Sequence, residues 1–205
     1  MKSSTLRAGL ALACALGLSA CGGGSGDLYL TGQITGGVTA DGLILQNNGG
    51  DDLVVPAGSA SFQFANRIST DDQFNITVKQ APSNSSVDKC HVLNGKARAN
   101  YYTIGQIYVS CDINQIALTV SVNGLTGSGL TLVNGSDKKD VPAGSTKVDM
   151  AQVYQDGPYA VKVLTQPAGQ TCTVTGGDTG TGTGTVGGTP ITSVAVNCTN
   201  NAAST

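Results

Sequence analysis

The residues that could perform chemistry in this chain are its cysteines, its only histidine and its aspartates. His91 directly follows Cys90, so these two residues are the only candidates for a cysteine nucleophile with an imidazole base. A serine nucleophile has no base other than His91, and no serine lies in a G-x-S-x-G motif. One histidine is also too few for a multi-histidine metal site. The sequence therefore predicts no catalytic residue.

Paired aspartates offer a second kind of chemistry. Asp51-Asp52 and Asp71-Asp72 lie in predicted loops, with Asp41 in a third, and carboxylates in loops can bind Ca²⁺. However, the D-x-[DN]-x-[DN]-G spacing is absent, and Lys138-Lys139 stands near the place of Asp51-Asp52 in the second half of the chain. A pair of glycosidase acids is also disfavoured, because the chain has no Glu and no aromatic platform. We interpret the aspartates as solvated turn residues and expect no metal and no cofactor.

Composition indicates which elements must position these residues. All thirteen acidic residues are Asp, Gly occurs 29 times and only 12% of residues are charged, so good helix formers are scarce. This composition favours an all-β protein with many turns. The net charge of -2 argues against nucleic acid as a partner. This composition, together with the missing catalytic residues, indicates that the protein is not an enzyme.

The N-terminus has the pattern of an export signal. Lys2 and Arg7 precede an apolar stretch from Ala8 to Leu18, which is shorter than the roughly 20 residues that a membrane-spanning helix needs. The sequence Leu18-Ser19-Ala20-Cys21 follows, and Gly22 to Gly26 is a Gly/Ser spacer. An ordinary secretory signal, with Cys21 free or in a disulfide, is the alternative interpretation.

Leu18-Ser19-Ala20-Cys21 resembles the lipobox of bacterial lipoproteins at all four positions. The resemblance implies that residues 1–20 are a cleaved signal peptide and that Cys21 becomes the lipidated first residue, with residues 21–27 as a flexible tether. Such an anchor carries two or three fatty acyl chains such as palmitate. Gly22 stands where Asp often marks retention in the inner membrane, so the resemblance implies the outer membrane if the cell has one.

The mature chain contains a duplication. Gly37–Asn47 matches Gly124–Asn134 at six of eleven positions, and Val-Pro-Ala-Gly-Ser occurs at 55–59 and again at 141–145. Two copies of one unit therefore span about residues 28–112 and 116–200, joined by the short linker Ile113–Gln115, which suggests a semi-rigid pair. Four cysteines remain after Cys14 and Cys21 are set aside, and they allow three pairings. The repeat favours bridges within each unit: Cys90–Cys111 and Cys172–Cys198.

Hydrophobic residues alternate with polar ones inside each unit. Phe74, Ile76 and Val78 share one face of a predicted strand, and Tyr159, Val161 and Val163 share the equivalent face in the second copy. With turn signals between some seven short strands per unit, the pattern predicts two tandem immunoglobulin-like β-sandwich domains. Trp is absent and both cysteines come late in each unit, so the bridge is not expected to be the inter-sheet disulfide of antibodies.

The unit also resembles a repeat found in uncharacterised proteobacterial surface proteins and lipoproteins. Its pattern here is G-L-T-G-S-G-L-T-L-V-N, then V-P-A-G, then Y-A-V-K-V-L-T-Q-P-A-G-Q-T-C-T-V, then V-A-V-N-C, and the second copy fits better than the first. The resemblance covers nearly all of the mature chain. It implies extracytoplasmic sandwich modules without a known chemistry.

Two further segments bear on binding. The low-complexity stretch Gly176–Gly188 is predicted to be a mobile loop held by the second disulfide, with a ligand-gripping loop as the alternative. Tyr101 and Tyr102 could stack on a sugar or a partner, although packing in the core or at a sheet edge is the favoured interpretation.

The sequence as a whole predicts a membrane-anchored cell-envelope lipoprotein with a non-enzymatic structural, scaffolding or adhesive role. Its predicted partner is the membrane, reached through the N-terminal lipid. The alternative is a surface module that binds a glycan or another protein, with strand edges open to β-augmentation.

Overall fold

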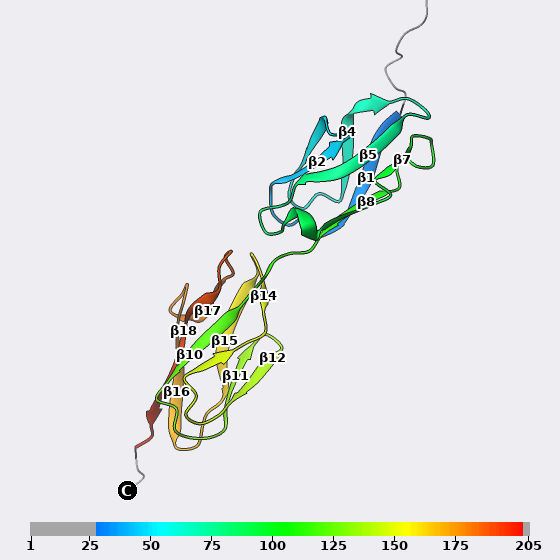
Figure 1. Ribbon diagram of the computed structural model, residues 1–205. Coiled ribbons are helices and arrows are strands. Elements are labelled where there is room, and N and C mark those ends of the chain that lie inside the picture. Colours follow the sequence, from blue (N-terminus) through cyan, green and yellow to red (C-terminus); the bar gives the residue numbers. More distant parts are fainter. Residues whose placement is uncertain (1–27, 203–205) are drawn as a thin grey trace, which may run out of the picture.

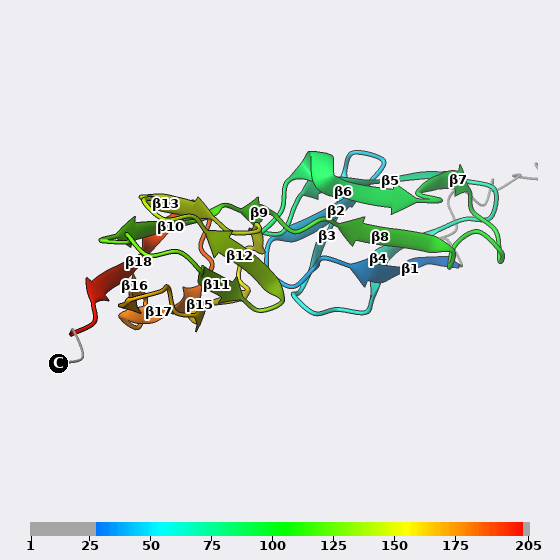
Figure 2. The same ribbon diagram turned by 90° about the horizontal axis from the view of Figure 1, so that it is seen from below.

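The computed structural model describes residues 28–202. The predicted signal peptide, Cys21 and the tether at 21–27 lie outside the described residues. Within them, the chain forms two β-sandwiches arranged end to end, with the start of β1 and the end of β18 at opposite ends of the pair (Figures 1 and 2). No helix in residues 28–202 is long and apolar enough to cross a membrane.

The first sandwich consists of two four-stranded sheets. One has the order β4-β1-β8-β6 and the other β3-β2-β5-β7, and the first and last strands of the unit, β1 and β8, pair in parallel. The elements are β1 (Leu28–Gly36), β2 (Leu43–Asn47), β3 (Asp51–Val55), β4 (Ser61–Ile68), β5 (Gln73–Gln80), the short 3₁₀ helix η1 (Val87–Lys89), β6 (Cys90–Leu93), β7 (Lys96–Arg98) and β8 (Ile107–Cys111).

The second sandwich repeats this strand order. Its strands β13-β10-β18-β16 correspond to β4-β1-β8-β6, and β12-β11-β15-β17 correspond to β3-β2-β5-β7. Its elements are β9 (Gln115–Ile116), β10 (Leu118–Asn123), β11 (Leu130–Asn134), β12 (Asp137–Val141), β13 (Lys147–Asp149), β14 (Val153–Tyr154), β15 (Pro158–Thr165), β16 (Gln170–Gly177), β17 (Thr181–Thr185) and β18 (Ile191–Asn200). The short strands β9 and β14 pair with each other.

Each sandwich has its own hydrophobic core, built by the alternation seen in the sequence. In the first core, Leu30 of β1 and Val109 of β8 meet Leu45 of β2 and Phe74 of β5 from the opposite sheet. The second core is built in the same way from β10, β11, β15 and β18. The order of buried and half-buried residues is identical in β2 and β11, and again in β3 and β12. The prediction of two tandem immunoglobulin-like β-sandwiches is confirmed.

The structure corrects the prediction for Gly176–Gly188. Thr181–Thr185 forms strand β17, which pairs with β15 and with β16 and so joins the two halves of the second sandwich into one eight-stranded sheet. The segment also supplies Val186, which is buried in the core. A mobile loop was therefore the wrong interpretation.

Close packing explains why this strand contains so much glycine. A Cβ atom added at Gly182 would lie 2.8 Å from the carbonyl oxygen of Val161, and a Cβ at Gly95 would lie 2.8 Å from that of Ile76 in the first sandwich. Both distances are too short for a real side chain, so the two copies need glycine at the same place. Gly182 also has a φ of 84°, which L-residues rarely adopt.

Candidate interaction surfaces

The four cysteines of the two sandwiches form two disulfides within the units. Cys90 of β6 is bonded to Cys111 of β8, and Cys172 of β16 is bonded to Cys198 of β18. In each case the two residues lie directly opposite each other in the antiparallel register. The bridges therefore link neighbouring strands of one sheet, as the late position of the cysteines in each unit predicts. Cys21 lies outside the described residues.

His91 and Cys90 do not form a nucleophile and base. The sulfur of Cys90 is bonded to that of Cys111, so it is no free thiol. His91 lies on the edge strand β6 opposite Ser110, with its side chain exposed. The arrangement provides no activated nucleophile at this position.

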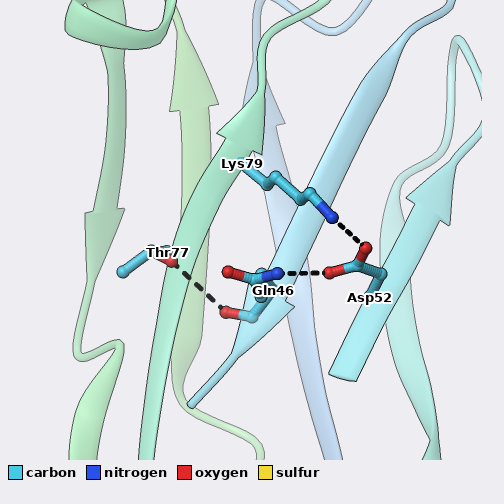
Figure 3. A network of polar contacts seen from close by, with 4 residues as sticks. All are labelled: Gln46, Asp52, Thr77 and Lys79. Atoms are coloured by element: carbon cyan, nitrogen blue, oxygen red, sulfur yellow. Dashed lines mark hydrogen bonds and ion pairs between the residues drawn. The ribbon is translucent and has the colours of Figure 1, made fainter. Parts of the chain in front are cut away.

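Most of the aspartates that the sequence offers as Ca²⁺ ligands have protein partners. Asp51 and Asp52 begin strand β3 and do not lie in a loop, which corrects the prediction. The Asp52 carboxylate accepts hydrogen bonds from the Lys79 ammonium and from Nε2 of Gln46, as Figure 3 shows. The bond from Lys79, followed by that from Gln46, lowers the pKa of Asp52 below its ordinary value. This carboxylate is thus part of a surface ion pair across β2, β3 and β5.

Asp51, Asp41 and Asp72 are each bonded to a different group. Oδ1 of Asp51 accepts a bond of 2.8 Å from Nδ2 of Asn66, and Oδ1 of Asp41 accepts one of 3.1 Å from the backbone N–H of Ala57. Asp72 accepts a bond of 3.2 Å from the N–H of Ser69. Among residues 28–202, no three His, Cys, Asp or Glu side chains converge as a metal site would require.

The junction between the sandwiches is held by one residue, Asn114. Its backbone N–H donates to the carbonyl of Asn84 at 2.9 Å, and its Oδ1 accepts from Nζ of Lys89 at 2.9 Å. Toward the second sandwich, its carbonyl accepts from the N–H of Gln155 at 2.9 Å, and its Nδ2 donates to the Gln155 side chain at 3.1 Å. The predicted linker is therefore bonded to both units, and its last residue, Gln115, already belongs to strand β9.

A solvent-open hollow of about 620 Å³ lies beside this junction. Gly37, Lys89 and Asp112 line it from the first sandwich, and Gln152 and Tyr154 line it from the second. We assign no ligand to it.

Tyr101 and Tyr102 are the most exposed aromatic residues of the described chain. They are 84% and 77% exposed, which corrects the prediction that they pack in the core or at a sheet edge. Their rings meet edge to face, with centroids 5.7 Å apart. Oδ1 of Asn100 accepts hydrogen bonds from the N–H groups of Tyr102 and Thr103, and Oγ1 of Thr103 donates to the carbonyl of Arg98. The turn therefore holds both rings out from the protein.

These tyrosines lie at the end of the first sandwich where β1 begins. The loop that carries them leads into β8, which runs parallel to β1, and the N–H of Thr31 donates to the carbonyl of Ile104 in this loop. Both views show the loop after β7 and the start of β1 at the same end (Figures 1 and 2). We call this end, formed by Leu28, the Ser69–Asp72 turn and the Asn100–Gln106 loop, the tyrosine pole.

Charges balance over the tyrosine pole and the strand ends beside it. The basic side chains are Arg67 of β4 and Lys96 and Arg98 of β7, all exposed, and the acidic ones are Asp71 and Asp72 of the pole and half-buried Asp51 of β3. Arg67 already has a partner within the protein, because its guanidinium lies 4.5 Å from the ring centre of Tyr29 and donates a hydrogen bond to the Tyr29 hydroxyl.

Each sandwich also has a buried polar residue near the end of its first long strand, β1 or β10, and the sequence pattern did not predict it. Gln170 is 4% exposed, and its Oε1 accepts from the N–H groups of Thr126 and Gly127. Its Nε2 donates to the carbonyl of Gly124 and to Oδ1 of Asn200. In the first sandwich, buried Asn84 takes this place with a bond to Thr39, the residue that matches Thr126 in the repeat. The Gly-x-Thr shared by both copies was the signal that could have located these bonds.

Comparisons with known proteins assign no family to this chain. No protein-family model matches the chain, and no curated protein matches it in sequence. Among solved structures, a C-terminal fragment of the pilus adhesin SpaC from Lactobacillus rhamnosus GG is similar over 86% of this chain and 100% of the fragment, at 11% identity and a TM-score of 0.43. A similarity of this degree carries no argument about function.

Proposed function

We propose that this protein is a non-enzymatic lipoprotein of the cell envelope, anchored through lipid on Cys21 and serving a structural, scaffolding or adhesive role. Where the cell has an outer membrane, that membrane is the proposed site of the anchor. The side chains of the sandwiches that could take part in chemistry form bonds within the fold: Cys90 is in a disulfide and Asp52 is in an ion pair.

The observation that supports this proposal most strongly is the disulfide in each sandwich. Disulfides form and persist in oxidising compartments outside the cytoplasm, which is where a lipobox would send the chain. Because all four cysteines after Cys21 are paired, Cys21 is the one cysteine of the proposed mature chain left to receive a lipid.

Replacing Cys21 with Ser is expected to abolish incorporation of a palmitate analogue into the protein. The hydroxyl of Ser does not take the place of the thiol to which the diacylglyceryl group of lipoproteins is attached. The measurement is metabolic labelling of the producing cells with alkyne-palmitate, followed by capture of the protein and detection of the alkyne.

Cys14→Ser is the matched control, because Cys14 lies in the apolar part of the proposed signal peptide and not at the lipobox. This variant is expected to label like the wild type. Labelling that persists in Cys21→Ser, or that is absent from the wild type, would contradict the proposed anchor.

A further inference from the structure

The tyrosine pole presents an amphipathic surface that the fold itself does not use. Tyr101 and Tyr102 project from a hydrogen-bonded turn, and Leu93, at the end of β6, is 62% exposed next to it. Tyr rings place an apolar body beside a polar hydroxyl, which is why they are enriched where apolar and aqueous phases meet. The root of the turn is fixed by Ala99, whose side chain is fully buried.

The same pole is the end of the molecule nearest to the proposed anchor, so this step rests on the proposed function. Six residues lie between Cys21 and Leu28, and the seven steps from Cys21 to Leu28 reach at most about 25 Å when fully extended. The start of β1 at the tyrosine pole therefore cannot lie farther than about 25 Å from the bilayer surface.

We propose that the tyrosine pole rests in the headgroup layer of the membrane that carries the anchor, with Tyr101 and Tyr102 inserted among the phospholipid headgroups. A short tether keeps the effective concentration of the pole at the membrane high, so a contact that is weak in isolation is occupied. The tether also leaves little room for a folded protein partner beneath the pole. Because the charges of the pole and of the adjoining ends of β3, β4 and β7 balance, we expect the contact not to depend on anionic lipid.

This contact orients the whole molecule relative to the membrane. With the pole on the membrane, the second sandwich points outward, because Asn114 is bonded to both units and transmits the orientation of the first to the second. The turns around Gly144 and Gly169, at the far end of the second sandwich, are then the part of the protein presented away from the membrane.

The test couples the mature chain, Cys21 to Thr205, through the thiol of Cys21 to maleimide-bearing phospholipid in phosphatidylcholine nanodiscs. A nitroxide on the lipid headgroups broadens amide resonances close to the membrane. We expect the signals of Asn100–Thr103 to lose most of their intensity and those around Gly144 to keep theirs, with the same pattern in nanodiscs that contain phosphatidylglycerol.

The double variant Tyr101→Ser/Tyr102→Ser is expected to recover most of the lost intensity at Asn100 and Thr103. Tyr154→Ser, which removes a tyrosine that is 59% exposed on the second sandwich, is the matched control and is expected to change nothing. Unbroadened signals at the pole would overturn the proposal and leave the tyrosines free for a sugar or a protein partner. Equal broadening along both sandwiches, as in a molecule lying flat, would also overturn it.

The chemical coupling separates this proposal from the proposed function. If Cys21 proves not to be lipidated in cells, the alkyne-palmitate experiment fails while the nanodisc result is unchanged. If the pole does not contact the nanodisc, the anchor on Cys21 is unaffected.

Discussion

Replacing Cys172 and Cys198 together with Ala is expected to lower the free energy of unfolding of the second sandwich by about 3 kcal/mol. The bridge closes a loop with a sequence separation of 26 residues, and removing it restores the chain entropy that the cross-link takes from the unfolded state. Alanine leaves no unpaired thiol in the buried positions of these two residues. Urea unfolding followed by circular dichroism, in a Cys21→Ser background, measures the change.

The first sandwich supplies the control for this prediction. Cys90→Ala/Cys111→Ala removes a bridge with a sequence separation of 21 residues and should lower the stability of the first sandwich by a similar amount, while leaving the second unchanged. If either double variant unfolded at the same urea concentration as its parent, the bridge would not contribute to stability. If one pair of substitutions destabilised both units equally, the sandwiches would not be independent folding units.

Gln170→Ala is expected to cost about 3 kcal/mol of folding free energy, because several backbone groups lose a buried partner at once. The N–H groups of Thr126 and Gly127 and the carbonyl of Gly124 all bond to this one side chain. Thermal and urea unfolding of the second sandwich measure the loss. The turn before β11 should also become accessible to hydrogen exchange, since both N–H groups lie in it.

Gln166→Ala is the matched comparison, four residues earlier in the chain. Gln166 makes two bonds to the backbone of Cys172, but these bonds are only partly buried and the Gln166 side chain is exposed, so water can replace part of them. We expect a loss of at most about 1 kcal/mol for this variant. A Gln170→Ala protein as stable as Gln166→Ala would show that the buried network does not hold the turn.

The fold could be predicted because two simple signals agree along the chain. The alternation at Phe74, Ile76 and Val78 identified a half-buried strand without any knowledge of its partners, and the duplication provided the same evidence twice. The duplication also selected one cysteine pairing out of three. These features depend on local pattern or on repetition, both of which are visible in one sequence.

Features that depend on contacts distant in sequence could not be predicted. The Gly176–Gly188 stretch has the composition of a loop, yet its Gly182 is required because β17 passes close to Val161 and Val174. Tyr101 and Tyr102 are exposed because Asn100 and Thr103 close a tight turn beneath them, which their own residue types do not reveal. The four hydrogen bonds of Asn114 reach residues that are 25 to 41 positions away in the sequence, so the residues around Asn114 do not reveal them.

The central claim, that this protein is a lipid-anchored envelope protein, is tested most directly by mass spectrometry of its N-terminal peptide. The protein would be extracted with detergent from the membranes of the cells that make it and cleaved before Asp27, which releases the peptide that ends at Gly26. We expect a peptide that begins at Cys21 and carries a diacylglyceryl group, with residues 1–20 absent. A peptide that retains Met1 to Ala20, or one that contains an unmodified Cys21, would contradict it.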